Sequence, residues 1–149
     1  MAYDTGFGGD LSNASMPAAT VIPVLNYADV AVAAAWLCRA FGFTQRLRIG
    51  DHRIQLNVGS GAIVVTQSDS DLGRTQYVNH SIMVRVSNVD HHFQKAMKEG
   101  ASVSGEPASM PYGERQYSAV DPGGHRWTFS QTEANVDPQL WGGVLLEGA

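Results

Sequence analysis

The stretch from Pro111 to Gln131 reads PYGERQYSAVDPGGHRWTFSQ, and it decides the fold. Residues 116–120 are rich in aromatic, hydroxyl and branched side chains, which favours a strand. Asp121-Pro-Gly-Gly124 then marks a turn, because Asp bonds its own loop, Pro fixes φ and Gly accepts positive φ. Residues 126–130 alternate in character, with Trp127 and Phe129 on one face and Arg126, Thr128 and Ser130 on the other. The stretch therefore predicts a hairpin with one face on a core and one polar face.

The rest of the chain repeats one order of elements twice. Asp29 and Asn88 are both N-cap residues in front of an apolar stripe at helical spacing, and Gly42 and Gly100 end those stripes. The two caps lie 59 residues apart (88 − 29). The expected strands are 19–27, 44–49, 52–58 and 62–67 in the first copy, and 80–86, 102–105, 115–120 and 126–131 in the second. This is an internal repeat of a βαβββ unit.

The repeat predicts the fold class and the domain organisation. We expect an α+β fold in which two βαβββ modules form a cupped, mostly antiparallel eight-stranded sheet with the helices on its convex side. The expected segments are a flexible N-terminal arm (1–18), a first module (19–67), a linker (68–76), a second module (77–131) and a C-terminal tail (132–149). The tail carries Leu140, Trp141, Val144, Leu145 and Leu146, so we expect it to pack on the body, on the cup mouth or on a second subunit.

Composition narrows the class of protein. Of 149 residues, 44% are hydrophobic and 16% are charged, which is typical of a globular protein. The formal net charge of −4 argues against nucleic-acid binding. No apolar run is long enough to span a membrane, and no secretory signal is evident. We expect a cytoplasmic protein in which the single Cys38 is a buried thiol.

Four phrases resemble the vicinal oxygen chelate superfamily, which includes glyoxalase I, bleomycin-resistance proteins and extradiol dioxygenases. They are Tyr27-Ala-Asp29, Arg39-Ala-Phe-Gly-Phe43, Tyr112-Gly-Glu-Arg-Gln-Tyr117 and Asp121-Pro-Gly-Gly-His-Arg-Trp-Thr-Phe129. The resemblance covers residues 19–131 and is closest to the bleomycin-resistance branch. It implies paired βαβββ modules, a concave site for a small molecule, a homodimer and, in the enzymes, a divalent metal held by His, Glu or Gln from the first and last strands of each module.

The metal positions that the resemblance implies fall near Ile22, Val64, Ser81 and Thr128, and none of these is a good ligand. We therefore expect no metal and no other cofactor, and we assign no catalytic residue. The preferred hypothesis is a metal-free protein that binds an antibiotic or aromatic small molecule. The alternative is a divalent-metal-dependent lyase, isomerase or dioxygenase with His80, His52 and Glu114 as its ligands. A catalytically silent structural dimer is a third hypothesis.

Nine residues are candidates for ligand binding: Asn26, His52, Ser81, Met83, Arg85, Tyr112, Arg115, Tyr117 and Thr128. Arg115 stands between aromatic residues, where it would hold a carboxylate or stack on a planar ring. The alternative for Arg115 is a surface salt bridge with Glu114 or Glu106. Met83 is either a wall of the cup or ordinary packing. We expect His91 and His92 on the surface, His125 bonded to loop backbone, and Trp36, Trp127 and Phe129 in the core.

Overall fold

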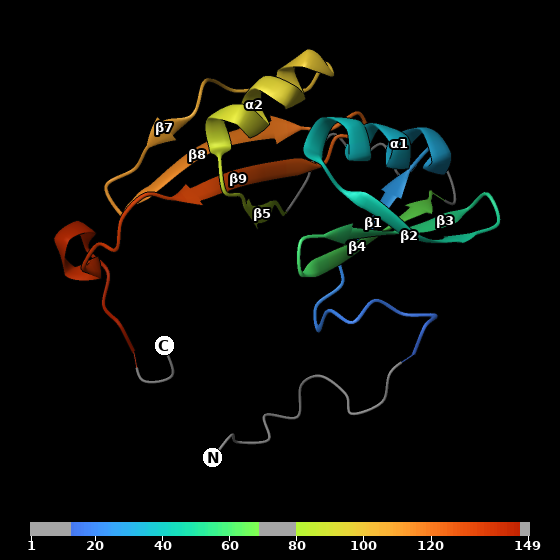
Figure 1. The fold of residues 1–149 in the computed structure, drawn as a ribbon, viewed down its shortest axis with the longest axis horizontal. Helices are drawn as coiled ribbons and strands as arrows, with labels where there is room; N and C mark the ends of the chain where they lie inside the picture. Colours follow the sequence, from blue (N-terminus) through green and yellow to red (C-terminus); the bar gives the residue numbers. More distant parts are fainter. Residues whose placement is uncertain (1–12, 69–79, 147–149) are drawn as a thin grey trace. The chain divides into compact units, whose positions relative to one another are not determined.

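The computed structural model describes residues 13–68 and 80–146, and the chain forms two compact units that divide between Gln76 and Tyr77 (Figure 1). The first unit contains β1 (Val24–Tyr27), α1 (Val30–Phe41), β2 (Thr44–Ile49), β3 (Arg53–Val58) and β4 (Gly61–Gln67). The second contains β5 (Ile82–Arg85), α2 (Val89–Lys98), β6 (Ser102–Val103), β7 (Ala108–Ser109), β8 (Glu114–Val120) and β9 (Arg126–Thr132). A short 3-10 helix, η2 (Pro138–Trp141), follows β9.

Both α-helices begin where the sequence places a cap. The Asp29 side chain accepts a hydrogen bond from the Val32 amide at 3.1 Å, and the Asn88 side chain accepts one from the His91 amide at 3.0 Å. These bonds satisfy amides that the first turn of a helix leaves without a partner. Gly42 ends α1 with a φ of 82°, a left-handed conformation that glycine adopts without strain.

The two sheets have the same topology. The first has the strand order β1-β4-β3-β2, and the second has the order β5-β9-β8-β6 with β7 paired to β8. The pairs β1–β4 and β5–β9 are parallel and the remaining pairs are antiparallel. The predicted α+β fold with two βαβββ modules is confirmed. The described residues add a ninth strand, the two-residue β7, which the sequence analysis missed. That the two sheets join into one cup stays a prediction.

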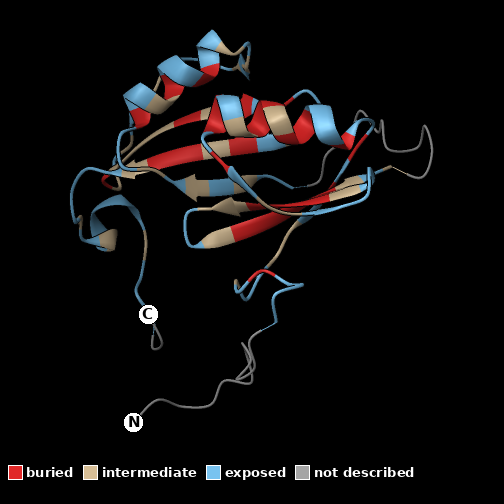
Figure 2. Cartoon of the chain, turned by 45° about the vertical axis from the view of Figure 1, so that its right-hand side comes forward, coloured by how far each residue is buried: buried red, intermediate tan, exposed pale blue. Residues whose placement is uncertain are grey.

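In each unit the core lies between the helix and one face of the sheet. Leu37 of α1 and Leu56 of β3 are fully buried in the first unit, and Trp127 and Phe129 of β9 are fully buried in the second. Figure 2 shows buried and exposed positions alternating along α1, as expected for a helix with one side against its sheet. The predicted core positions of Trp36, Trp127 and Phe129 are confirmed. We call the opposite face of each sheet its helix-free face.

The first strand is shorter than predicted. It begins at Val24 and not at Ala19, because Pro23 has no amide hydrogen to continue the ladder and contributes only its carbonyl, which accepts from the Val64 amide at 2.9 Å. Most of the predicted arm (1–12), most of the predicted linker (69–76) and the chain end (147–149) lie outside the described residues.

The C-terminal tail makes fewer contacts than predicted. The amides of Glu133 and Ala134 donate to the Gly113 carbonyl, and the Trp141 ring lies 5.4 Å from the Tyr112 ring. Four further apolar side chains of the tail are at least 70% exposed: Leu140, Val144, Leu145 and Leu146. Of the three predicted positions, packing on the body is therefore not seen for these four side chains, while packing on the cup mouth or on a second subunit stays a prediction.

Candidate functional site

The Asp121 carboxylate organises the end of the second sheet. It is 4% exposed, and its Oδ1 accepts hydrogen bonds from the amides of Gly123 at 2.9 Å and His125 at 3.0 Å. Its Oδ2 accepts from the indole N–H of Trp127 at 3.0 Å. One buried carboxylate thus closes the turn and fixes the first core residue of β9, which sets the register of the hairpin.

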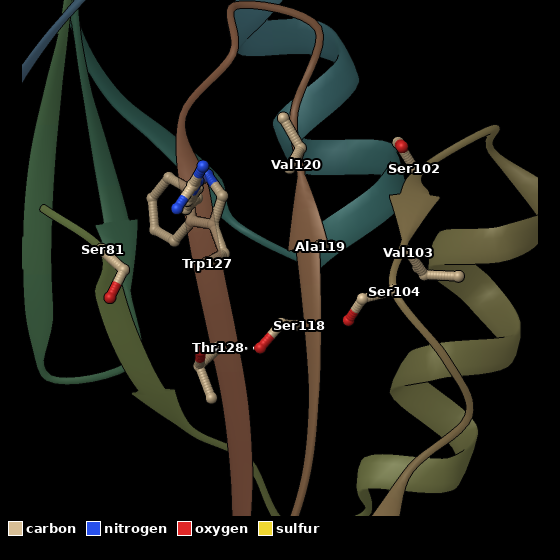
Figure 3. A pocket seen from close by; sticks show the side chains of 10 residues that line it. Ser81, Ser102, Val103, Ser104, Ser118, Ala119, Val120, Trp127 and Thr128 are labelled. Carbon is tan, nitrogen blue, oxygen red and sulfur yellow. Dashed lines mark hydrogen bonds between the residues drawn. The ribbon is translucent and has the colours of Figure 1, made fainter. Parts of the chain in front are cut away.

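That register places hydroxyl groups opposite each other on the helix-free face. Ser118 of β8 pairs with Thr128 of β9, and Thr128 pairs in turn with Met83 of β5. The hydroxyl oxygens of Ser118 and Thr128 are 3.0 Å apart and hydrogen-bonded (Figure 3). Because Trp127 and Phe129 take the core face, Thr128 between them must point away from the helix.

A pocket of about 490 Å³ opens over this row. Its lining mixes short hydroxyl side chains with apolar ones and one cation: Ser81, Ser102, Val103, Ser104, Ser118, Ala119, Val120, Arg126, Trp127 and Thr128 (Figure 3). The volume lies within the range of small-molecule sites, about 300–1,000 Å³. Hydroxyl groups both donate and accept hydrogen bonds, so the pocket is suited to a ligand with neutral polar groups.

Further along β8 and β9 a second polar row continues on the same face. The Tyr112 hydroxyl donates to Gln116 Oε1 at 3.0 Å, and Gln116 Nε2 donates to Ser130 Oγ at 3.0 Å. Ser130 donates in turn to Glu114 Oε1 at 2.7 Å. Hydrogen bonds from Ser130 and Thr132, with a smaller contribution from the charge of Arg85, hold the pKa of Glu114 below its usual value. The row ends in a carboxylate that stays ionised.

Five of the nine predicted ligand-binding residues lie on or beside this face of the second unit. Ser81 and Thr128 line the pocket. Met83, which is 65% exposed, and Arg85 alternate with the half-buried Ile82 and Val84 along β5, and Tyr112 begins the second polar row. The exposure of Met83 favours its interpretation as a wall residue over ordinary packing.

Arg115 lies on the helix side of β8. Its guanidinium donates to the Asp90 carboxylate of α2, with Nη2–Oδ1 and Nε–Oδ2 distances of 2.9 and 3.0 Å. Its Nη1 also donates to Ser109 Oγ at 3.3 Å. Of the two predicted roles, the structure shows the salt bridge, but its partner is Asp90 and not Glu114 or Glu106. Alternation explains this, since Arg115 and Glu114 point to opposite faces.

Tyr117 is also on the helix side and is 3% exposed. Its ring stacks on Phe129 with centroids 5.3 Å apart, and burial raises the pKa of its hydroxyl. That hydroxyl is hydrogen-bonded to Nδ1 of His92, whose ring centroid lies 4.1 Å from that of Phe129. The prediction of a surface position for His92 was wrong, because the first turn of α2 packs directly over this part of β8.

The two remaining candidates belong to the first unit. Asn26 is an exposed residue of β1, in register with Thr66 of β4. His52 is exposed in the turn between β2 and β3, and its carbonyl accepts from the Gln67 amide at 3.1 Å and from the Thr66 hydroxyl at 3.3 Å. Neither residue lines the pocket of the second unit.

The metal that the resemblance implies does not fit the donor set. Among residues 13–68 and 80–146, no three His, Cys, Asp or Glu side chains come close enough together to hold a metal ion. At the implied positions Val64 is a buried aliphatic residue, and Ser81 and Thr128 are neutral hydroxyls. Neutral hydroxyls are weak ligands for the divalent metals concerned.

Sequence reasoning missed Ser102, Ser104 and Ser118 in the pocket, and Gln116 and Ser130 in the second polar row. A signal for three of them was present. From residue 116 to residue 119 polar and apolar residues alternate, and the turn that follows β8 sets Gln116 opposite Ser130 and Ser118 opposite Thr128. Ser102 begins a strand of only two residues and Ser104 follows it, so neither could be assigned to a face from the sequence pattern.

Comparisons with known proteins agree with this geometry. The family model described as "Glyoxalase/Bleomycin resistance protein/Dioxygenase superfamily" matches residues 19–129. The crystal structure of TioX from Micromonospora sp. ML1 is similar at 31% sequence identity and a TM-score of 0.63, over 78% of this chain and 98% of TioX. A hypothetical protein, SA1046, from S. aureus is 19% identical with a TM-score of 0.63, over 74% of this chain and 91% of that one.

A glyoxalase/bleomycin resistance protein/dioxygenase family enzyme from Burkholderia phytofirmans PsJN is similar in fold, at 17% identity and a TM-score of 0.65, over 74% of this chain and 96% of that one. No protein of curated function matches this chain significantly. Among the described residues, no helix has both the length and the apolar character needed to cross a membrane.

Proposed function

Since the chain belongs to the Glyoxalase/Bleomycin resistance protein/Dioxygenase superfamily, we propose that it is a metal-free binding protein for a planar or aromatic small molecule, such as an antibiotic. One observation carries the proposal: Ser81 and Thr128, at positions where the resemblance implies metal ligands, line a pocket of about 490 Å³ as neutral hydroxyls. The site therefore has room for a ligand and groups to orient it, without the donors that would hold a divalent ion.

The pocket chemistry favours recognition by shape and a few hydrogen bonds. Val120 contributes apolar surface, while Ser118 and Thr128 satisfy each other and can redirect their hydrogen bonds to a ligand. Each such hydrogen bond contributes about 0.5–1.5 kcal/mol to binding, so most of the affinity comes from the apolar area that the ligand buries.

The alternative of a metal-dependent lyase, isomerase or dioxygenase needs His80, His52 and Glu114 to act as ligands. These three do not form a group that could hold a metal in the described residues. No observation favours the alternative, and it enters the experiment as one of the outcomes.

Equilibrium dialysis tests the proposal. The full chain is treated with EDTA and dialysed against bleomycin and a panel of flat aromatic compounds, and the measurement is repeated after loading with zinc, nickel, iron or manganese. We expect binding by the EDTA-treated protein and no more than a small change on loading. Absence of binding at millimolar ligand, or binding that appears only with metal, refutes the proposal, and the second result supports the alternative.

Two matched variants place the ligand. Thr128→Val removes a pocket hydroxyl at constant shape, and we expect about a fivefold to tenfold loss of affinity from one lost hydrogen bond. Thr66→Val removes a hydroxyl that bonds the His52 carbonyl in the first unit, and we expect unchanged affinity. Equal effects of the two substitutions would remove the ligand from the pocket.

We also propose that the protein acts as a homodimer in the cytoplasm. The exposed apolar side chains of the tail support a contact with a second copy. The half-buried Cys38 has no second cysteine in the sequence with which to form an internal disulfide, which is usual for a protein of a reducing compartment. Light scattering of the purified full chain tests the dimer, and a monomer at micromolar concentration contradicts it.

A further inference from the structure

The helix-free face of the first sheet is bound by a segment of the chain's own N-terminal region, residues 13–17. The side chain of Asn13 shapes this segment, since its Oδ1 accepts from the Ser15 amide at 3.0 Å and its carbonyl accepts from the Met16 amide at 3.1 Å. The turn leaves the carbonyls of Ala14 and Ser15 directed at the sheet. The segment lies on the side of the sheet away from α1 (Figures 1 and 2).

Two side chains of the sheet receive those carbonyls. Gln55 Nε2 donates to the Ser15 carbonyl at 2.8 Å, and Arg46 Nη2 donates to the Ala14 carbonyl at 2.8 Å. Arg46 Nη1 also donates to Gln55 Oε1, so the two donors are fixed relative to each other. Gln55 is 2% exposed, although it stands on the face that has no helix.

Local structure explains why these side chains reach the same point. Gln55 lies between Ile54 and Leu56, which are buried on the core face, so alternation directs it to the helix-free face. The pairing of β2 with β3 shifts register between Gln45 and Leu47, and Arg46 is the extra residue of this irregularity. Such bulges re-aim side chains, and here the bulge brings a guanidinium beside Gln55.

The positive charge of Arg46 is not matched by an acidic group in the segment 13–17 that it contacts. Arg46 is a full cation, yet its partners in the described residues are a neutral amide and a neutral carbonyl, and it makes no ion pair with any acidic residue described. Arg48 on the same strand, by contrast, lies 3.5 Å from the Asp51 carboxylate. A carboxylate adds the attraction of an opposite charge to the hydrogen bonds of a guanidinium and presents two acceptor oxygens to it, which a neutral carbonyl does not.

We propose that Arg46 and Gln55 form a binding site for a small-molecule carboxylate, and that residues 13–17 fill this site with two backbone carbonyls until such a ligand displaces them. The two oxygens of one carboxylate replace the Ala14 and Ser15 carbonyls as acceptors for Arg46 Nη2 and Gln55 Nε2. The tethered segment competes at a high effective concentration, so the free carboxylate binds with an apparent dissociation constant in the millimolar range.

All residues of this site belong to the first unit, and those that line the hydroxyl pocket belong to the second. The experiment therefore observes Gln55 by NMR and replaces Arg46 and Gln55 in turn. The full chain, labelled with ¹⁵N, is titrated with sodium benzoate and, separately, with the neutral analogue benzamide. The Gln55 side-chain amide signal reports binding, and hydrogen exchange at the Ser15 and Met16 amides reports displacement of the segment.

We expect benzoate to shift the Gln55 side-chain signal and to accelerate exchange at Ser15 and Met16 about tenfold, while benzamide does neither. Arg46→Met should abolish the benzoate response, and Arg48→Met, which removes an arginine from the same strand, should preserve it. Gln55→Glu is a second variant, and it is read by hydrogen exchange alone because it lacks the side-chain amide. Its carboxylate pairs with Arg46 and repels the ligand, so benzoate should not change exchange at Ser15 and Met16. Slow exchange of the Leu56 amide shows that each variant is folded.

Three outcomes overturn the inference: no shift of the Gln55 signal on addition of benzoate, a shift of that signal without faster exchange at Ser15 and Met16, or an equal response in Arg46→Met. The first two make the segment a permanent part of the fold. None of these results involves Thr128, whose replacement tests the pocket in the dialysis experiment, so failure here and failure of the proposed pocket are distinguishable.

Discussion

The Asp121 carboxylate offers the sharpest test of how the second unit is built. Asp121→Asn keeps the size of the side chain but replaces one acceptor oxygen with an NH2 group. Whichever way the amide is turned, that NH2 faces an N–H donor, either the indole of Trp127 or the amides of the 121–125 turn. Hydrogen bonds to a charged group contribute about 1.5–3 kcal/mol, and an unsatisfied buried donor costs about 1–3 kcal/mol. We expect Asp121→Asn to lower the free energy of unfolding by about 3 kcal/mol.

Urea unfolding followed by tryptophan fluorescence and far-UV circular dichroism measures this loss. Asp137→Asn is the control, since Asp137 Oδ1 accepts a single exposed hydrogen bond from the Gln139 amide, and asparagine caps about as well as aspartate. Trp127→Phe removes the indole N–H. The double variant Asp121→Asn/Trp127→Phe should therefore lose less free energy of unfolding than the sum of the losses in the two single variants. A change below about 0.5 kcal/mol in Asp121→Asn would refute the reasoning, because surface substitutions already reach that size.

Three further predictions use the same measurements or simple titrations. Gly113 and Gly124 both have a φ of 86°, so we expect Gly124→Ala to lower the free energy of unfolding by about 1 kcal/mol. Gly113→Ala should lower it at least twice as much, because only at Gly113 does the added Cβ collide with the backbone of the tail. Ser130→Ala should raise the pKa of Glu114 toward its usual value, as measured by an NMR titration. The ionised Glu114 stabilises the fold above pH about 4.3, and on acidification the variant should lose this stability at a higher pH than the unsubstituted protein. Burial raises the pKa of Tyr117, so its contribution is fully present below pH about 10 and is lost as the pH rises further; Tyr117→Phe should flatten that alkaline loss in urea titrations, and an unchanged slope would contradict it.

Much of the fold could be predicted from local signals. Asp29 and Asn88 cap the helices as expected, and the Asp-Pro-Gly-Gly turn joins β8 to β9 as expected. These signals are reliable because each satisfies backbone groups within a few residues of itself. The two-residue β7 lacks any such signal, since its pairing with β8 depends on a partner several residues away.

The candidate site was harder to predict, because side-chain direction depends on register across strands. Tyr117 and Arg115 were assigned to the cup from their chemistry, although the turn at 121–124 pairs Tyr117 with the core residue Phe129. That pairing places Tyr117 on the helix side, and Arg115, two residues earlier on the same strand, lies on the same side. The contact of Gln55 with residues 13–17 joins parts of the chain 40 residues apart in sequence, and no local pattern carries it.

The repeat shows how one row of three side chains decides the use of each sheet. In matching topology, the central row of the helix-free face is Val24, Val64 and Gln55 in the first unit and Met83, Thr128 and Ser118 in the second. In the first row the long side chain of Gln55 donates a hydrogen bond to the Ser15 carbonyl, and Gln55 and Val64 are buried. Short hydroxyls in the second row reach only each other, and the space above them remains as the pocket. Lengthening Ser118 to Gln should therefore reduce ligand binding to the second unit by filling that space, whereas the same backbone position in the first unit already carries this side chain without loss of fold.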